Sequence, residues 1–199
     1  MTHQICVRHN FETAHRLPHL AGKCMNLHGH SWWAEVTVRA PLLSAEQTVV
    51  EFGAFKKGLR AFVDEHLDHG AMLGIDDPLA SVLVAHGSKV FLFGEHPYAG
   101  DLPYPTVEAV AVMLGRAAQS LLAGLPHAAG AAVARVKVTE THVNAAEFRP
   151  QAGATPALWL QPGATPATRP QSDATPAIRP QPGATPITRP SAADTVGGA

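Results

Sequence analysis

Two segments near the start of the chain alternate between apolar and polar residues. In residues 4–15 the positions that share one parity are Ile5, Val7, Phe11 and His15. In residues 28–39 they are His28, His30, Trp32, Val36 and Val38. A period of two is that of a strand with one buried face. We therefore predict two strands that pair as a hairpin, with residues 16–27 as the connecting loop.

Apolar residues in later segments recur at helical spacing. Between residues 53 and 67 they lie three or four positions apart, which predicts an amphipathic helix. Asp77, followed by a proline, predicts the start of a short helix over 78–86. Thr106 is a suitable N-cap for a second long helix. Its expected buried face comprises Val107, Val110, Leu114, Ala117 and Leu121.

Two more alternating runs, Lys89–Phe93 and Arg135–Thr141, predict further strands. The predicted order is strand, strand, helix, short helix, strand, helix, strand. Such an order is typical of an α+β fold. We expect one domain over residues 1–150.

The chain changes character after Pro150. Four ten-residue units follow, each with Ala-Thr-Pro at the same place, and nine of the seventeen prolines lie in residues 151–199. Proline removes backbone donors and disfavours helix, and the segment has few large apolar residues. We predict a disordered tail over 151–199. The functional alternative is a polyproline segment that binds a partner, with Trp159 as its aromatic anchor.

The charge balance excludes some classes of partner. Fifteen basic and sixteen acidic residues leave no electrostatic footprint for nucleic acid or an anionic membrane. The chain has no long apolar run, and its two cysteines do not make a disulfide framework. We therefore expect a soluble cytoplasmic protein. Twelve histidines, all before residue 143, are the one compositional hint of chemistry.

Three of these histidines have the spacing of a metal site. His28 and His30 are two apart on a predicted strand, so their side chains point the same way, and His15 shares the buried parity of its own strand. Three neutral imidazoles leave the fourth position of a tetrahedral Zn²⁺ open for catalysis. The alternatives are isolated histidines, another divalent metal, or a closed structural site with Cys24 as fourth ligand.

Cys24 has an environment that favours a thiolate. It lies in the loop beside Lys23 and just before the predicted metal strand, where positive charge stabilises the ionised thiol. Asp68 and His69 form an adjacent pair that suits proton transfer, although such a pair is also ordinary at the end of a helix.

Glu140 shares the parity of Val136 and Val138 on the last predicted strand. A carboxylate on an apolar face needs a partner, and a ligand with two parallel N–H donors would satisfy it. The alternative is that the strand ends at Thr139 and leaves Glu140 in solvent.

Together these motifs resemble the 6-pyruvoyltetrahydropterin synthase superfamily over about residues 5–148. The cysteine followed after three residues by His-Gly-His is similar to the bacterial 6-carboxytetrahydropterin synthase branch. The motifs that carry the resemblance are Phe11–Pro18, Lys23–Ser31, Leu67-Asp68-His69, Pro105-Thr106-Val107-Glu108 and Val138-Thr139-Glu140-Thr141.

The resemblance implies a tunnelling fold: a small antiparallel sheet with two long helices on one face. It also implies a homo-oligomer in which subunits join edge to edge as a barrel, as trimers stacked into hexamers, with active sites between subunits. Relative to the family, Glu51, Gly74 and Ala109 replace an Asp and two Asn residues. The stretch Gly70–Tyr104 is longer than usual, and its part Glu95–Pro103 is either a lid or an idle loop.

The resemblance further implies a site and a reaction. His15, His28 and His30 would bind zinc, Cys24 would abstract a proton, Asp68 and His69 would complete the relay, and Glu140 would anchor the pterin ring. The substrate would be 7,8-dihydroneopterin triphosphate. The products would be 6-carboxytetrahydropterin, a queuosine precursor, with acetaldehyde and triphosphate. The alternatives are a pyruvoyl-forming or other pterin synthase and a non-catalytic zinc or pterin binder.

Overall fold

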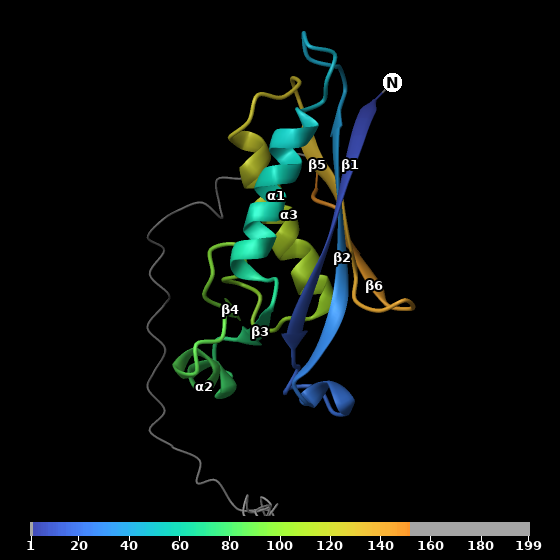
Figure 1. Cartoon of the computed structure of the whole chain (residues 1–199). Helices are drawn as coiled ribbons and strands as arrows, with labels where there is room; N and C mark the ends of the chain where they lie inside the picture. The colour runs from blue at the N-terminus through green and yellow to red at the C-terminus, as the bar shows by residue number, and fades with distance from the viewer. Residues whose placement is uncertain (1, 152–199) are drawn as a thin grey trace, which may run out of the picture. The chain divides into compact units, whose positions relative to one another are not determined.

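The computed structural model describes residues 2–151, so the predicted tail lies almost wholly outside the described residues. A six-stranded sheet in the order β4-β3-β1-β2-β5-β6 forms its centre (Figure 1). The strands are β1 (His3–His15), β2 (His28–Ala40), β3 (Gly70–Gly74), β4 (Val90–Phe93), β5 (Ala132–Thr139) and β6 (Ala145–Phe148).

Strands β1 and β2 form the predicted hairpin. They pair along their whole length, from His3 opposite Ala40 to His15 opposite His28. Burial alternates as expected, with Phe11 and Trp32 buried on the helix-covered face. The structure confirms the predicted hairpin. The prediction succeeded because a period of two that continues over thirteen residues is a strong signal of a strand.

The sheet is mixed, which corrects the prediction of an antiparallel one. β1 pairs in parallel with β3, and β3 pairs in parallel with β4, whereas the other pairs are antiparallel. Sequence patterns missed β3 because it is short, bounded by glycines and buried from Ala71 to Gly74, so it does not alternate. They also missed β6, whose four residues include only one large apolar side chain, Phe148.

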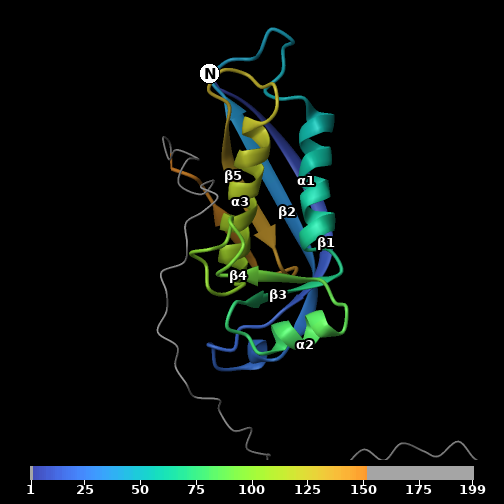
Figure 2. The ribbon, with the colours of Figure 1, turned by 90° about the vertical axis from the view of Figure 1, so that its left-hand side faces the viewer.

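Two long helices lie side by side along the sheet (Figures 1 and 2). These are α1 (Phe52–His66) and α3 (Val107–Ala123), both close to their predicted bounds; a short helix, α2 (Leu79–Ala85), follows β3. Glu51 caps α1 by accepting from the N–H groups of Gly53 and Ala54, and Thr106 caps α3 by accepting from the N–H of Ala109. The main core lies between the helices and the sheet.

The segment between β4 and α3 is anchored to α3. Arg116, which is buried on α3, donates to both carboxylate oxygens of Asp101 and to the carbonyl of Tyr98. Ala99 is fully buried in the core. These contacts favour the second of the two predicted roles for Glu95–Pro103, a fixed loop rather than a lid.

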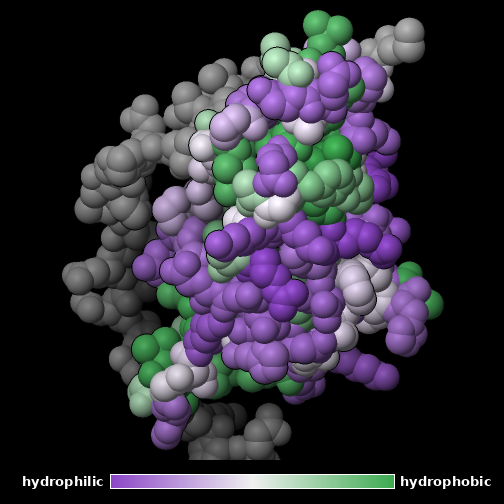
Figure 3. All heavy atoms as spheres, turned by 45° about the horizontal axis from the view of Figure 1, so that its top comes forward, coloured by the Kyte–Doolittle hydropathy of each residue, from purple (hydrophilic) through white to green (hydrophobic). Residues whose placement is uncertain are grey.

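Some apolar side chains stay uncovered in a single chain. Figure 3, which brings the upper end of Figure 1 forward, shows a green apolar patch within a largely hydrophilic surface. Leu42, just after β2, and Phe52, the first residue of α1, are 67% and 49% exposed. No helix within residues 2–151 is long and apolar enough to cross a membrane.

Candidate functional site

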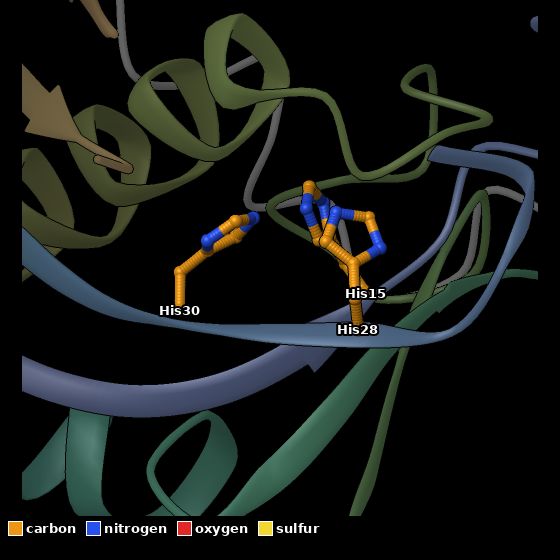
Figure 4. Close-up of side chains that lie close together, drawn as sticks. All are labelled: His15, His28 and His30. Atoms are coloured by element: carbon orange, nitrogen blue, oxygen red, sulfur yellow. The ribbon is translucent and has the colours of Figure 1, made fainter. Parts of the chain in front are cut away.

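Three imidazoles converge where β1 ends and β2 begins. His15 and His28 are direct partners across the hairpin, and His30 lies two residues further along β2. One nitrogen atom from each ring lies within 4.8 Å of the others. All three side chains project from the same side of the hairpin and face one another (Figure 4). The register of the hairpin thus brings the predicted metal ligands together.

Backbone carbonyls fix the orientation of two of the rings. His15 Nδ1 donates to the carbonyl of Pro105 at 2.9 Å, and His28 Nδ1 donates to the carbonyl of Asn26 at 2.7 Å. A carbonyl oxygen can only accept, so in each neutral ring the proton sits on Nδ1 and Nε2 keeps its lone pair. Such second contacts orient metal-binding histidines. Sequence analysis included Pro105 in a motif of the resemblance but did not predict that its carbonyl orients His15, because every residue carries a carbonyl.

The surroundings of the rings favour neutral imidazole. Burial lowers the pKa of His15 and of His30 below the ordinary value for histidine. His15 Nε2 is buried and has no hydrogen-bond partner among the described residues. A buried nitrogen lone pair without a partner is costly, and a bound cation would satisfy it. The residues present therefore fit a divalent metal ion such as Zn²⁺, which favours three neutral imidazoles.

Glu140 lies next to the three histidines. Strand β5 ends at Thr139, as the alternative prediction held, but the Glu140 side chain is only 17% exposed. Its Oε1 lies 3.2 Å from His15 Nε2 and 3.8 Å from His30 Nε2. The backbone N–H of Glu140 donates to the carbonyl of Asn144, which holds the turn before β6. The carboxylate is therefore directed into the site rather than into solvent.

Cys24 is near the site in sequence but outside the cluster of ligand atoms. It lies on an exposed 3-10 turn, Lys23–Met25, and its carbonyl accepts from the N–H of Leu17 at 2.7 Å. That hydrogen bond closes the loop between β1 and β2, the two strands that carry the three histidines. The metal-binding group found among residues 2–151 contains the three histidines without Cys24. The thiol is thus accessible and does not close the site in the described structure.

Asp68 and His69 form a hydrogen-bonded pair beside β1. His69 Nδ1 donates to Asp68 Oδ2 at 2.8 Å, and the His69 side chain is 79% exposed. Burial alone would raise the pKa of Asp68, but hydrogen bonds from the Glu12 N–H and from His69 hold it below its ordinary value. No hydrogen bond, ion pair or ring contact in the described part of the chain joins this pair to the metal cluster.

The backbone at His69 adopts an unusual conformation. Its φ is 56°, in the left-handed region that non-glycine residues seldom adopt. Its N–H donates to the carbonyl of Glu12 on β1 at 2.7 Å, which leads the chain directly into β3. Strained residues of this kind cluster at functional sites. A left-handed residue is also common just after the end of a helix, so the conformation fits both the functional and the ordinary helix-end interpretation of His69.

An ion pair supports the loop that follows β1. The Arg16 guanidinium donates to both carboxylate oxygens of Asp77, and the Asp77 side chain is 1% exposed. Burial alone would raise the pKa of Asp77, but the bonds from Arg16 and from the Leu79 N–H hold it below its ordinary value. Asp77 thus links the residue after His15 to the start of α2, a contact that no sequence pattern indicated.

Comparison with known proteins shows the family of this chain. Residues 4–151 match the family described as 6-pyruvoyl tetrahydropterin synthase. The chain belongs to this family. A Synechocystis protein named 6-carboxy-5,6,7,8-tetrahydropterin synthase is 39% identical over 83 residues, which cover 38% of this chain and 64% of that protein. A Rickettsia bellii protein of the same name is 32% identical over 49% of this chain and 72% of its own length. The chain thus spans just under two thirds of the Synechocystis relative.

Solved structures share the fold. An uncharacterized protein from Wolinella succinogenes aligns with a TM-score of 0.58 at 23% identity and covers 76% of this chain and 99% of its own. The 6-pyruvoyl tetrahydropterin synthase of Caenorhabditis elegans aligns with a TM-score of 0.53 at 18% identity and covers 76% of this chain and 97% of its own. At these identities the likeness shows the fold alone.

Proposed function

We propose that this protein is a zinc-dependent 6-carboxytetrahydropterin synthase. It would convert 7,8-dihydroneopterin triphosphate and one water molecule to 6-carboxy-5,6,7,8-tetrahydropterin, acetaldehyde and triphosphate. The observation that carries the proposal is the convergence of three imidazoles around a buried Nε2 that has no hydrogen-bond partner in residues 2–151. The names of the Synechocystis and Rickettsia relatives support this branch of the family.

The side chains of this chain have distinct roles in the proposed reaction. A zinc ion held by the three histidines supplies positive charge that polarises and acidifies the side-chain hydroxyls of the substrate. Cys24, as a thiolate, removes a proton from the side chain. His69 accepts a proton at Nε2 while Asp68 holds its Nδ1–H. Glu140 accepts the two parallel N–H donors of the pterin ring.

The proposed site uses more than one copy of the chain. Asp68 and His69 make no hydrogen bond, ion pair or ring contact with the three histidines within residues 2–151, and in the proposed assembly a second copy of the chain would supply them. Strands β4 and β6 lie at the two edges of the sheet, where an open strand can pair with another subunit. The exposed Leu42 and Phe52 also favour burial against a copy.

Metal removal and restoration test the proposal. We expect the purified full chain to hold about one zinc ion per chain, measured by mass spectrometry of the metal. Chelation should abolish turnover of dihydroneopterin triphosphate, and added zinc should restore it. His28→Ala should lose both zinc and turnover. His3→Ala, which changes an exposed histidine at the far end of β1, is the matched control and should retain both. Turnover by stringently metal-free protein would refute the proposal.

A non-catalytic zinc or pterin binder is the second candidate. The lack of any hydrogen bond or ion pair between the Asp68–His69 pair and the three histidines within residues 2–151 favours it, because a relay needs such a connection. In that case zinc and pterin bind but no product forms at any protein concentration. The presence or absence of turnover in the metal experiment distinguishes the two functions.

A further inference from the structure

The contact between Glu140 and two of the histidines has an unusual form. Glu140 Oε1 lies 3.2 Å from His15 Nε2 and 3.8 Å from His30 Nε2. The 3.2 Å contact is not a hydrogen bond, because His15 Nε2 has no hydrogen-bond partner in the described part of the chain. Two polar atoms thus approach each other in a buried place without the geometry that an N–H···O bond requires.

The tautomer of His15 gives a reason why Nε2 does not donate a hydrogen bond to Glu140. Its Nδ1 donates to the Pro105 carbonyl, so Nε2 of the neutral ring presents a lone pair. A carboxylate oxygen, which is also an acceptor, lies 3.2 Å from that nitrogen but off the axis along which a ring N–H would point. Two acceptors this close to each other repel unless a cation lies between them. The arrangement therefore calls for a positive ion that both atoms contact.

The spacing matches that of two ligands on one metal ion. Bonds of about 2.0–2.1 Å at tetrahedral angles separate neighbouring ligand atoms by about 3.3 Å. The contacts of Glu140 Oε1 with His15 and His30, at 3.2 and 3.8 Å, lie on either side of this value. Like the Cys24 thiol, Glu140 Oε1 lies outside the group of ligand atoms formed by the three histidines, so a small movement of the carboxylate toward His28 would bring it onto an ion bound there.

We propose that Glu140 is the fourth ligand of the metal in the substrate-free protein. This inference rests on the proposed function, which assigns the same carboxylate to the pterin ring. The oxygen that binds the ion cannot at the same time accept from the ring, so arrival of the pterin draws the carboxylate away. The fourth position then opens only when substrate is present, and the ion stays closed to other ligands until then.

Cobalt substitution tests the assignment. Co²⁺ occupies sites of zinc type, and its visible absorption depends on the number and kind of its ligands. We expect Glu140→Gln, in the full chain, to change the visible spectrum of the Co²⁺ protein and to weaken metal affinity by about tenfold or more. Glu147→Gln is the matched control, because Glu147 pairs with Arg135 and Arg149 on β5 and beyond β6. It should leave spectrum and affinity unchanged.

A titration of the unmodified protein provides a second test that does not depend on the folding of a variant. Adding 7,8-dihydroneopterin to the Co²⁺ protein should change the spectrum as Glu140 leaves the ion. An identical spectrum and affinity in Glu140→Gln, or pterin binding with no spectral change, would overturn the inference while leaving the proposed function intact. Failure of the unmodified protein to bind metal would instead overturn the proposed function.

Discussion

His15 connects most of the interactions at the site. It ends β1, pairs with His28 across the hairpin and receives its orientation from Pro105, ninety residues away in sequence. Its ring also packs edge-on against Trp32, with ring centroids 5.0 Å apart. Spacing on the hairpin was sufficient to predict that the three imidazoles converge. The support from Pro105 was not predictable, because it depends on how the segment before α3 returns to the sheet.

Substitution of Cys24 distinguishes a catalytic metal site from a structural one. Because its thiol lies outside the cluster of ligand atoms, we expect Cys24→Ala to retain zinc and thermal stability. Turnover should fall by about a hundredfold or more, the usual contribution of a positioned proton-transfer group. Metal analysis and steady-state kinetics check both parts, with Cys6→Ala as the control. Loss of zinc from Cys24→Ala would instead favour a closed site of one cysteine and three histidines.

His96 should make stability depend on pH. Burial, with a smaller contribution from nearby His66, lowers the pKa of His96 from 6.5 to about 4. The unfolded chain therefore binds a proton on this ring between pH 6.5 and 4 while the folded chain does not. Stability is full above this window and is lost as pH falls through it, by about 2 kcal/mol after allowance for solvent screening.

Urea denaturation at pH 7 and pH 4 measures this dependence. His96→Gln should lose less stability on acidification than the unmodified chain. His86→Gln, a change at an exposed histidine after α2, should behave like the unmodified chain. Equal losses in all three proteins would show that His96 is not responsible.

At the scale of elements, long periodic segments were predictable and short ones were not. The hairpin and the helices α1, α2 and α3 appear close to their predicted bounds. Strand β3 was not predictable because it is buried on both sides, and the parallel pairing of β3 follows from tertiary packing. Gly74 shows what a sequence pattern cannot reveal. A Cβ at this position would lie 2.6 Å from the Pro103 carbonyl oxygen, so this chain has no room for the asparagine that the resemblance led us to expect here.

Arg116 should be important for the segment that precedes α3. We expect Arg116→Met to destabilise the fold by about 1–2 kcal/mol, because it removes hydrogen bonds from a buried guanidinium to the exposed Asp101 carboxylate and to the Tyr98 carbonyl. Arg60→Ala is the control, since Arg60 and Asp64 form an exposed pair on α1 worth less than about 0.5 kcal/mol. Thermal denaturation compares the two, and equal effects would contradict the anchoring role of Arg116.

At the scale of the whole molecule, no hydrogen bond, ion pair or ring contact in the described chain joins the candidate metal ligands to the Asp68–His69 pair. In the proposed symmetric assembly, neighbouring copies would join the two parts. The sequence predicted both parts by motif, but only the structure shows that no direct contact within residues 2–151 links them. The role of residues 152–199 stays a prediction, since they lie outside the described residues.

Mixing inactive chains tests whether sites are shared. Cys24→Ala and His69→Ala should each be inactive alone. If each site takes Cys24 from one copy and His69 from another, chains co-expressed in equal amounts should recover activity in about a quarter of their sites. A mixture as inactive as its components would place both residues of a working site in one chain.

Product identification tests the central claim most directly. The zinc-loaded full chain is incubated with 7,8-dihydroneopterin triphosphate, and the products are identified by mass spectrometry. We predict 6-carboxytetrahydropterin and acetaldehyde in equal amounts, and neither from Cys24→Ala. Formation of a 6-pyruvoyl product would contradict the proposed branch of the family, and an unchanged substrate in the presence of bound zinc would contradict the proposed catalysis.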